Sequence, residues 1–213
     1  MRNVLRAGIF GLCILTSAGG VQASDLTGLT PNEIRSIFPD MGGATQSSVP
    51  AGRYGSLIAR VSQALGMDAF LVDAVIYRES NYRADAVSHA DAIGLMQLIP
   101  KAGAADAYAH LYGHAGQPTR ASLMQPDINV WLGTAYLQLL ERRYFSEFAQ
   151  EVRIPLVLAA YNWGIGRILK AAPPPMISRG EVLAWIAEHC PDETKTYVSR
   201  VLSAYDRARL ASL

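Results

Sequence analysis

The strongest candidate for chemistry in this sequence is Glu79, an acidic residue on an otherwise apolar helical face. Apolar spacing after Asp68, a residue type that favours helix N-caps, predicts a helix that extends to Glu79. Residues three, four and seven apart share a helical face, so Glu79 is expected beside Val72 and Val75. Burial raises the pKa of a carboxyl, which suits a proton donor near neutral pH. The alternative is a structural acid paired with a neighbouring arginine.

A second candidate region is the polar loop that follows this helix. It contains Ser88 and closes on Gly94, after which Met96 and Gln97 follow. This composition suits a groove that holds a polar polymer. Met96 is also expected to fill a gap in the core, as methionine commonly does.

Two later stretches place polar side chains at helix ends. Tyr161 and Asn162 lie at the mouth of an apolar helix, beside Trp163. Glu193 and Tyr197 lie one turn apart and share a helical face. On residue type alone, both tyrosines are equally compatible with a core position in which the hydroxyl is satisfied. Trp163 either stacks on a ligand or covers the core, and we favour the core.

The elements that must position these residues are helices. Helical periodicity and Gly or Pro boundaries predict seven of them in residues 54–65, 68–80, 100–112, 127–144, 156–162, 181–189 and 193–210. Pro155 is expected to open the fifth of these. No stretch alternates with period two and no internal repeat is present, so the predicted class is all-α.

The N-terminus indicates export. Residues 1–23 have the basic start, short apolar stretch and small-residue end of a cleaved signal peptide. The apolar stretch is too short to span a bilayer comfortably, although an uncleaved anchor stays open. Residues 24–51 form a leader with one capping-box pattern for a short helix, and residues 52–213 form the expected single domain. The predicted location is the periplasm.

Charge and cysteine content exclude several classes of function. The chain has 19 basic and 18 acidic residues, and removal of the signal takes away two arginines and no acid. A nearly neutral product has no electrostatic footprint for nucleic acid. Cys190 would be the one remaining cysteine, so no internal disulfide is expected. His110 and His114 have metal-ligand spacing, but no third ligand is evident, and we predict neither a metal nor a cofactor.

Taken together, four motifs in order resemble the family 1 lytic transglycosylases, lysozyme-like enzymes that cleave peptidoglycan. The motifs are Glu79-Ser80 followed by Ser88, Gly94-Leu95-Met96-Gln97-Leu98-x-Pro100, Ala160-Tyr161-Asn162-x-Gly164, and Glu193-Thr194-x-x-Tyr197-Val198. The likeness covers about residues 55–206 and is greatest for the membrane-bound lytic transglycosylase C branch, because of Asp91-Ala92. That branch is usually lipid-anchored, whereas Cys13 follows leucine rather than the small residue expected at a lipidation site. The resemblance implies a goose-type lysozyme-like helical domain with a substrate cleft.

The resemblance also implies residue roles. Glu79 would protonate the glycosidic oxygen and then act as base, with no second carboxylate required. The remaining roles would be sugar binding by Ser88, Gln97 and Asn162, packing by Met96, support of Glu79 by Tyr161 and Tyr197, and anchoring of the cleft floor by Glu193. The partner would be peptidoglycan glycan strands, and the protein is expected to be a monomer.

Two alternatives remain at this point. A hydrolytic muramidase would need a second acid, for which Asp85 and Asp91 are the candidates. A peptidoglycan-binding scaffold of a secretion apparatus would keep the groove without turnover, but it would have no need of a buried acid. A trans-envelope secretion machine as partner is also compatible with catalysis, because such machines require local opening of the wall.

Overall fold

The structure is a computed structural model that describes residue 50 and residues 52–171 and 173–212. The predicted signal peptide and almost all of the leader lie outside these residues. The helices are α2 (Gly55–Leu65), α3 (Ala69–Ser80), α4 (Gly103–Tyr112), α5 (Arg120–Leu123), α6 (Pro126–Leu139), the π-helix η3 (Leu140–Tyr144), α7 (Gln150–Trp163), α8 (Ile165–Ala171), α9 (Arg179–His189) and α10 (Asp192–Ala211). In the described part of the chain, β-pairing is limited to two isolated bridges. The all-α prediction is confirmed.

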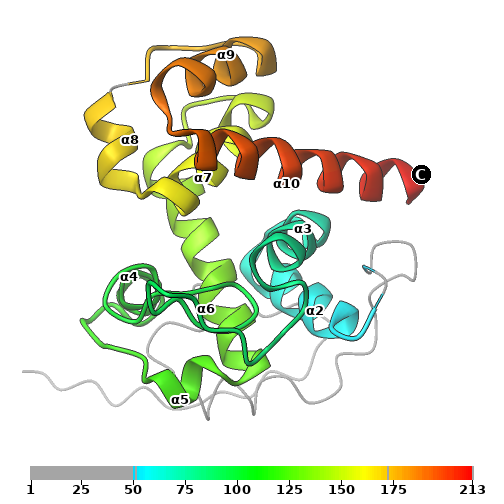
Figure 1. Cartoon of the computed structure of the whole chain (residues 1–213), viewed down its shortest axis with the longest axis vertical. Coiled ribbons are helices and arrows are strands. Elements are labelled where there is room, and N and C mark those ends of the chain that lie inside the picture. The colour runs from blue at the N-terminus through cyan, green and yellow to red at the C-terminus, as the bar shows by residue number, and fades with distance from the viewer. Residues whose placement is uncertain (1–49, 51, 172, 213) are drawn as a thin grey trace, which may run out of the picture.

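Helix α6 is the centre of the molecule. Every residue from Ile128 to Leu139 is buried, so this helix has no solvent-facing side. It packs against α4 on one flank and α2 on the other, and α3 packs on α2 (Figure 1). None of the helices within residues 52–171 and 173–212 is long and apolar enough to cross a bilayer.

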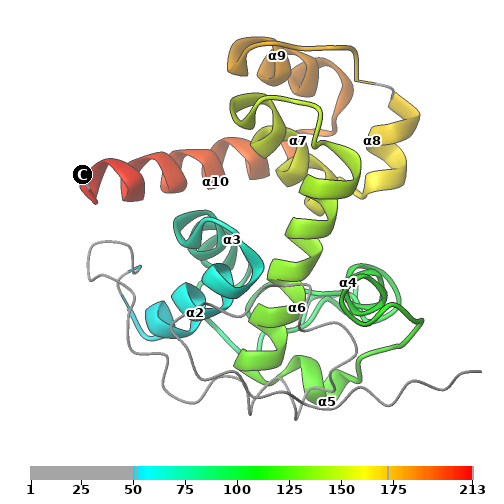
Figure 2. The same cartoon turned by 180° about the vertical axis from the view of Figure 1, so that it is seen from behind.

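Helix α10 connects α3, near the start of the described chain, with α7. It crosses α3 and packs against α7, as the view from behind also shows (Figure 2). The Tyr205 hydroxyl on α10 donates to Asp68 Oδ2 at 2.8 Å. Asp68 also accepts from the Phe70 N–H at 2.9 Å, which confirms its predicted N-cap role. One carboxylate therefore starts α3 and fixes it to α10.

Two of the helix predictions differ from the structure. Helix α7 begins at Gln150, and Pro155 lies inside it rather than at its start. Proline removes one helical hydrogen bond near the beginning of α7, and here it is buried. The single helix expected over 127–144 changes to π-helical hydrogen bonding at Leu140, which the apolar spacing does not reveal.

Candidate active site

Glu79 occupies the last turn of α3, which ends where Asn81 adopts a left-handed conformation (φ 50°). Its side chain is half-buried. Loss of solvent around the carboxyl raises the pKa of Glu79 from 4.5 to about 7. The Tyr197 hydroxyl and the Arg78 charge oppose this rise in pKa, and the Glu193 charge adds to it. Near neutral pH both protonation states are populated, which suits a group that gives and takes one proton.

Tyr197 lies against this carboxyl from α10. It is 2% exposed, and its hydroxyl lowers the pKa of Glu79 although the contact falls outside standard hydrogen-bond geometry. Burial and the nearby Glu79 charge raise the pKa of Tyr197 well above its usual value of 10. The Arg78 guanidinium lies 5.7 Å from the centroid of the Tyr197 ring. Tyr197 therefore stays a neutral phenol beside the acid.

Tyr161 approaches from the end of α7. Its hydroxyl donates to the Met96 carbonyl at 2.7 Å, so α7 is fixed to the polar loop. Burial, followed by the Glu79 charge, raises the pKa of Tyr161 well above 10. Because its proton is committed to Met96, the Tyr161 oxygen is left as an acceptor.

Asn162 and Glu193 lie on neighbouring helix ends. The Thr194 hydroxyl donates to Asn162 Oδ1 at 2.7 Å, joining the end of α7 to the start of α10. The Asn162 amide nitrogen has no hydrogen-bond partner among the described residues and remains available for a ligand. Glu193 is exposed in the first turn of α10, and it is near enough to raise the pKa of Glu79.

Ser88 and Gln97 belong to the loop between α3 and α4. Ser88 Oγ accepts from two backbone N–H groups of its own turn, at 3.1 and 3.2 Å, which leaves its proton free to donate. Gln97 Nε2 donates to the carbonyls of Ala86 and Gly94 at 3.1 and 2.9 Å. Its Oε1 has no partner in the described part of the chain. Both side chains bond to the backbone of their own loop. The Ser88 hydroxyl proton and Gln97 Oε1 are left for another partner.

The residue that holds this loop to the core is Asn129, which the sequence analysis did not single out. Asn129 is fully buried on α6, accepts from the Met96 N–H at 2.8 Å, and donates to the Ile93 and Leu123 carbonyls at 2.8 and 2.7 Å. In the sequence, the one indication of this role is that the polar Asn129 lies three residues before Leu132, at the edge of an apolar helical face.

Two glycines make room for this arrangement. A Cβ at Gly133 would lie 2.3 Å from Met96 Sδ, so the side chain of Met96 needs a glycine on α6. Gly94 has φ +78°, and its Cβ would lie 2.3 Å from Asn129 Nδ2. Met96 is 0% exposed, which confirms that it fills the core.

Other carboxylates are engaged elsewhere. Asp91 pairs with Arg120 at 3.3 Å and Asp85 with Arg83 at 3.9 Å, all of them exposed. Among the described residues, the charges that shift the pKa of Glu79 are those of Arg78 and Glu193. Neither candidate second acid from the sequence therefore acts on Glu79, and the acid that does is Glu193.

The histidine pair has ordinary neighbours. His110 Nε2 lies 2.9 Å from Gln138 Oε1, and His114 Nδ1 lies 3.1 Å from the Ala115 carbonyl. No cluster of three or more potential metal ligands occurs within the described ranges.

An all-helical fold in which a glutamate with a pKa raised to about 7 lies beside two neutral tyrosines is typical of the lysozyme-like class. The family model for the transglycosylase SLT domain matches residues 56–174. The chain belongs to this family, and the resemblance drawn from its motifs is confirmed.

Individual relatives support the assignment to this family. The chain is 37% identical over 121 residues to membrane-bound lytic murein transglycosylase C of Sodalis glossinidius, covering 56% of this chain and 34% of the relative. It is 34% identical over 165 residues to the protein of that name from Salmonella typhimurium, covering 72% and 46%. The chain thus spans about a third to a half of the length of these curated relatives.

Solved structures of similar fold are larger proteins as well. An inactive mutant of the lytic transglycosylase Slt from Pseudomonas aeruginosa superposes with a TM-score of 0.60 at 27% identity, covering 74% of this chain and 24% of that one. The 70 kDa soluble lytic transglycosylase from Escherichia coli has a TM-score of 0.59 at 24% identity with the same coverage, a likeness of fold.

Proposed function

We propose that this protein is a peptidoglycan lytic transglycosylase in which Glu79 is the catalytic acid and then the base. The observation that carries the proposal is the Glu79 carboxyl, which has a pKa of about 7, contacts Tyr197 and lies within electrostatic range of Tyr161. Membership of the SLT family supports it.

The proposed reaction uses one proton twice. Protonated Glu79 gives its proton to the oxygen between N-acetylmuramic acid and N-acetylglucosamine as the bond from C1 to that oxygen breaks. The acetamido group of the substrate stabilises the positive centre at C1. The Glu79 carboxylate then takes the proton of the muramic C6 hydroxyl while its oxygen bonds to C1, which gives a 1,6-anhydro ring. Water does not enter the balance, so no second carboxylate is required.

The neighbouring residues have supporting roles in this proposal. The free donor of Ser88, the free acceptor of Gln97 and the free amide of Asn162 would bind the sugar or its acetamido group. Met96 would pack beneath them and present its carbonyl to Tyr161. Tyr197 would orient the catalytic acid. Glu193 would anchor the floor of the cleft.

The proposed setting is the periplasm, with glycan strands as substrate and residues 52–213 as the catalytic domain of a monomer. The relatives are named as membrane-bound proteins. For this chain we propose export by a cleaved signal in residues 1–23, followed by residues 24–51 as a leader. Action beside a trans-envelope secretion machine fits the same activity.

The test is mass spectrometry of the fragments that the exported protein releases from purified sacculi, beside the Glu79→Gln variant. We expect anhydromuramyl products from the native protein and a loss of about 10²- to 10⁴-fold in the variant, the range for removal of a general acid. Circular dichroism of the variant controls for folding.

Two results would contradict the proposal. Products one water heavier would identify a hydrolytic muramidase and direct attention to Glu193, the second acid near Glu79. Binding to sacculi without release by either protein would identify a scaffold.

A further inference from the structure

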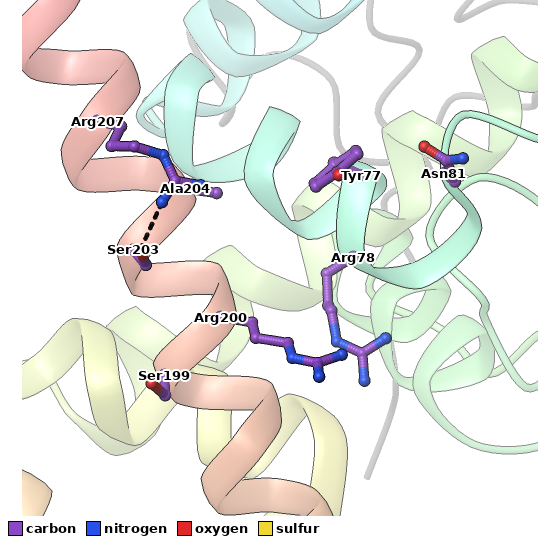
Figure 3. Close-up of a pocket in the computed structure, with 8 residues that line it drawn as sticks. All are labelled: Tyr77, Arg78, Asn81, Ser199, Arg200, Ser203, Ala204 and Arg207. Carbon is purple, nitrogen blue, oxygen red and sulfur yellow. Dashed lines mark hydrogen bonds between the residues drawn. The ribbon is translucent and has the colours of Figure 1, made fainter.

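A polar pocket separate from the residues proposed for catalysis lies between α3 and α10. It has a volume of about 580 Å³ and contains none of the residues assigned above to sugar binding or catalysis. Its polar lining comes from both sides: Arg78 of α3 with Asn81 directly after that helix, and Ser199, Arg200, Ser203 and Arg207 of α10 (Figure 3). The proposed reaction does not use this pocket.

The lining is cationic, although the charge of Arg78 also acts on Glu79. It contains three arginines and no acid. Arg179 and Arg153 each pair with a carboxylate, at 2.6 and 2.9 Å. By contrast Arg78, Arg200 and Arg207 form no ion pair with any described residue. Like charges gathered on two elements repel one another, so the arrangement favours a bound anion.

Two donors of this pocket, one from each helix, converge. Figure 3 shows the guanidinium groups of Arg78 and Arg200 extending into the same space from α3 and α10. Arg78 Nε is buried and has no partner among the described residues. Arg207 Nη1 donates to Ser203 Oγ at 2.7 Å, which positions that hydroxyl and guanidinium together. Arg200, Ser203 and Arg207 recur at helical spacing along one side of α10.

We propose that this pocket binds a phosphate group carried on a small polar body such as glycerol or a sugar. Guanidinium forks and serine hydroxyls supply several directed donors for phosphate oxygens, a combination that matches phosphate better than a monovalent ion. A volume of 580 Å³ is far larger than a lone ion requires and lies within the usual range for a small-molecule site. The half-exposed Tyr77 ring forms an apolar side for the body of the ligand.

Calorimetric titration of the full exported protein with glycerol 3-phosphate, at constant ionic strength, tests this proposal. We expect saturable binding to one site, with sodium acetate in place of the phosphate giving none. Arg200→Ala and Arg207→Ala should each weaken binding by about tenfold or more, the effect of losing a charge-assisted hydrogen bond. Arg200→Lys should recover part of the affinity, because it restores the charge but not the fork.

The matched control is Arg143→Ala, which removes an exposed arginine on η3, outside the pocket. Equal weakening by Arg143→Ala and Arg200→Ala would overturn the proposal, because binding would then reflect overall charge. Absence of saturable binding to the native protein would also overturn it. Both arginines of the α10 variants are exposed, so folding should be unaffected.

Sedimentation with vesicles identifies the source of the phosphate. Phosphatidylglycerol vesicles that carry down the native protein but not Arg200→Ala would assign the pocket to a lipid headgroup, with phosphatidylcholine vesicles as control. Binding of glycerol 3-phosphate without vesicle binding would assign it to a soluble phosphate ester. Either result is separate from cleavage of sacculi, so this proposal and the proposed function can fail independently.

Discussion

The two walls of the Glu79 site are built in different ways. The loop wall, residues 86–98, is held through its backbone: the buried Asn129 side chain of α6 accepts from the Met96 N–H and donates to the Ile93 carbonyl. The helical wall, formed by the end of α7 and the start of α10, is held by side chains. There the Thr194 hydroxyl reaches Asn162 and the Tyr161 hydroxyl reaches across to the loop.

The loop wall determines the rigidity of the site, whereas the helical wall influences the pKa of Glu79. A backbone carbonyl or N–H cannot be relocated without moving the chain, so the loop wall has one arrangement and sets the shape of the site. On the helical wall the Tyr197 hydroxyl lowers the pKa of Glu79, and we expect the loss of one such hydroxyl to change the fold little. We therefore expect substitutions on the two walls to differ in kind.

The largest expected difference between the walls is in stability, when the asparagine that holds each wall is replaced. Asn129→Ala leaves one buried N–H and two buried carbonyls without partners and should lower the free energy of unfolding by about 3–5 kcal/mol. Asn162→Ala removes one contact at a half-buried position and should cost about 1 kcal/mol. Urea unfolding at neutral pH measures both, and equal losses would contradict the distinction between the walls.

Next in size is the dependence of stability on pH. The pKa of Glu79 is about 7 in the folded protein against 4.5 for an ordinary glutamate, so folding favours the protonated form. The native protein should lose stability as pH rises from about 4.5 to 7, by up to about 3 kcal/mol. Glu79→Gln removes this titration, so the variant should be more stable than the native protein at pH 8 and similar to it at pH 4.

Comparison of urea unfolding at these two pH values cancels the titration of other groups, because they are common to both proteins. A stability difference that does not change with pH would show that the carboxyl keeps an ordinary pKa.

The smallest effect distinguishes the two tyrosines. Tyr197→Phe removes a hydroxyl that lowers the pKa of Glu79, so that pKa should rise, by less than about one unit. Tyr161→Phe removes a donor to the Met96 carbonyl instead, and its effect on the pKa of Glu79 should be smaller. Carbon-13 NMR titration of the Glu79 carboxyl measures both, and a larger shift for Tyr161→Phe would reverse the assignment.

Glu79 and much of the helical wall could be predicted from sequence because these residues lie in short motifs. Glu79 stands out as an acid on an apolar face, and Glu193 and Tyr197 share a face by helical spacing alone. That Glu193 acts on Glu79, rather than Asp85 or Asp91, depends on how α10 meets α3. Helical periodicity carries no information about such a meeting.

The loop wall was less accessible to prediction. Asn129 lies 33 residues from the N–H that it accepts, and nothing local marks it as a partner of Met96. The need for glycine at position 133 likewise appears only once the sulfur of Met96 is in place. Pro155 was misjudged because proline usually opens a helix, whereas tertiary packing holds it inside α7.

The attachment of the loop wall to α6 also has a consequence for the timescale of its motion. Amides in a fully buried helix exchange their hydrogens with solvent only in rare, large openings, whereas those of most loops exchange readily. The Met96 amide belongs to a loop, but its hydrogen bond ends on the most enclosed helix of the described chain. The Met96 amide hydrogen should therefore exchange as slowly as the amide hydrogens of α6. The loop wall would then keep its structure for as long as the protein stays folded.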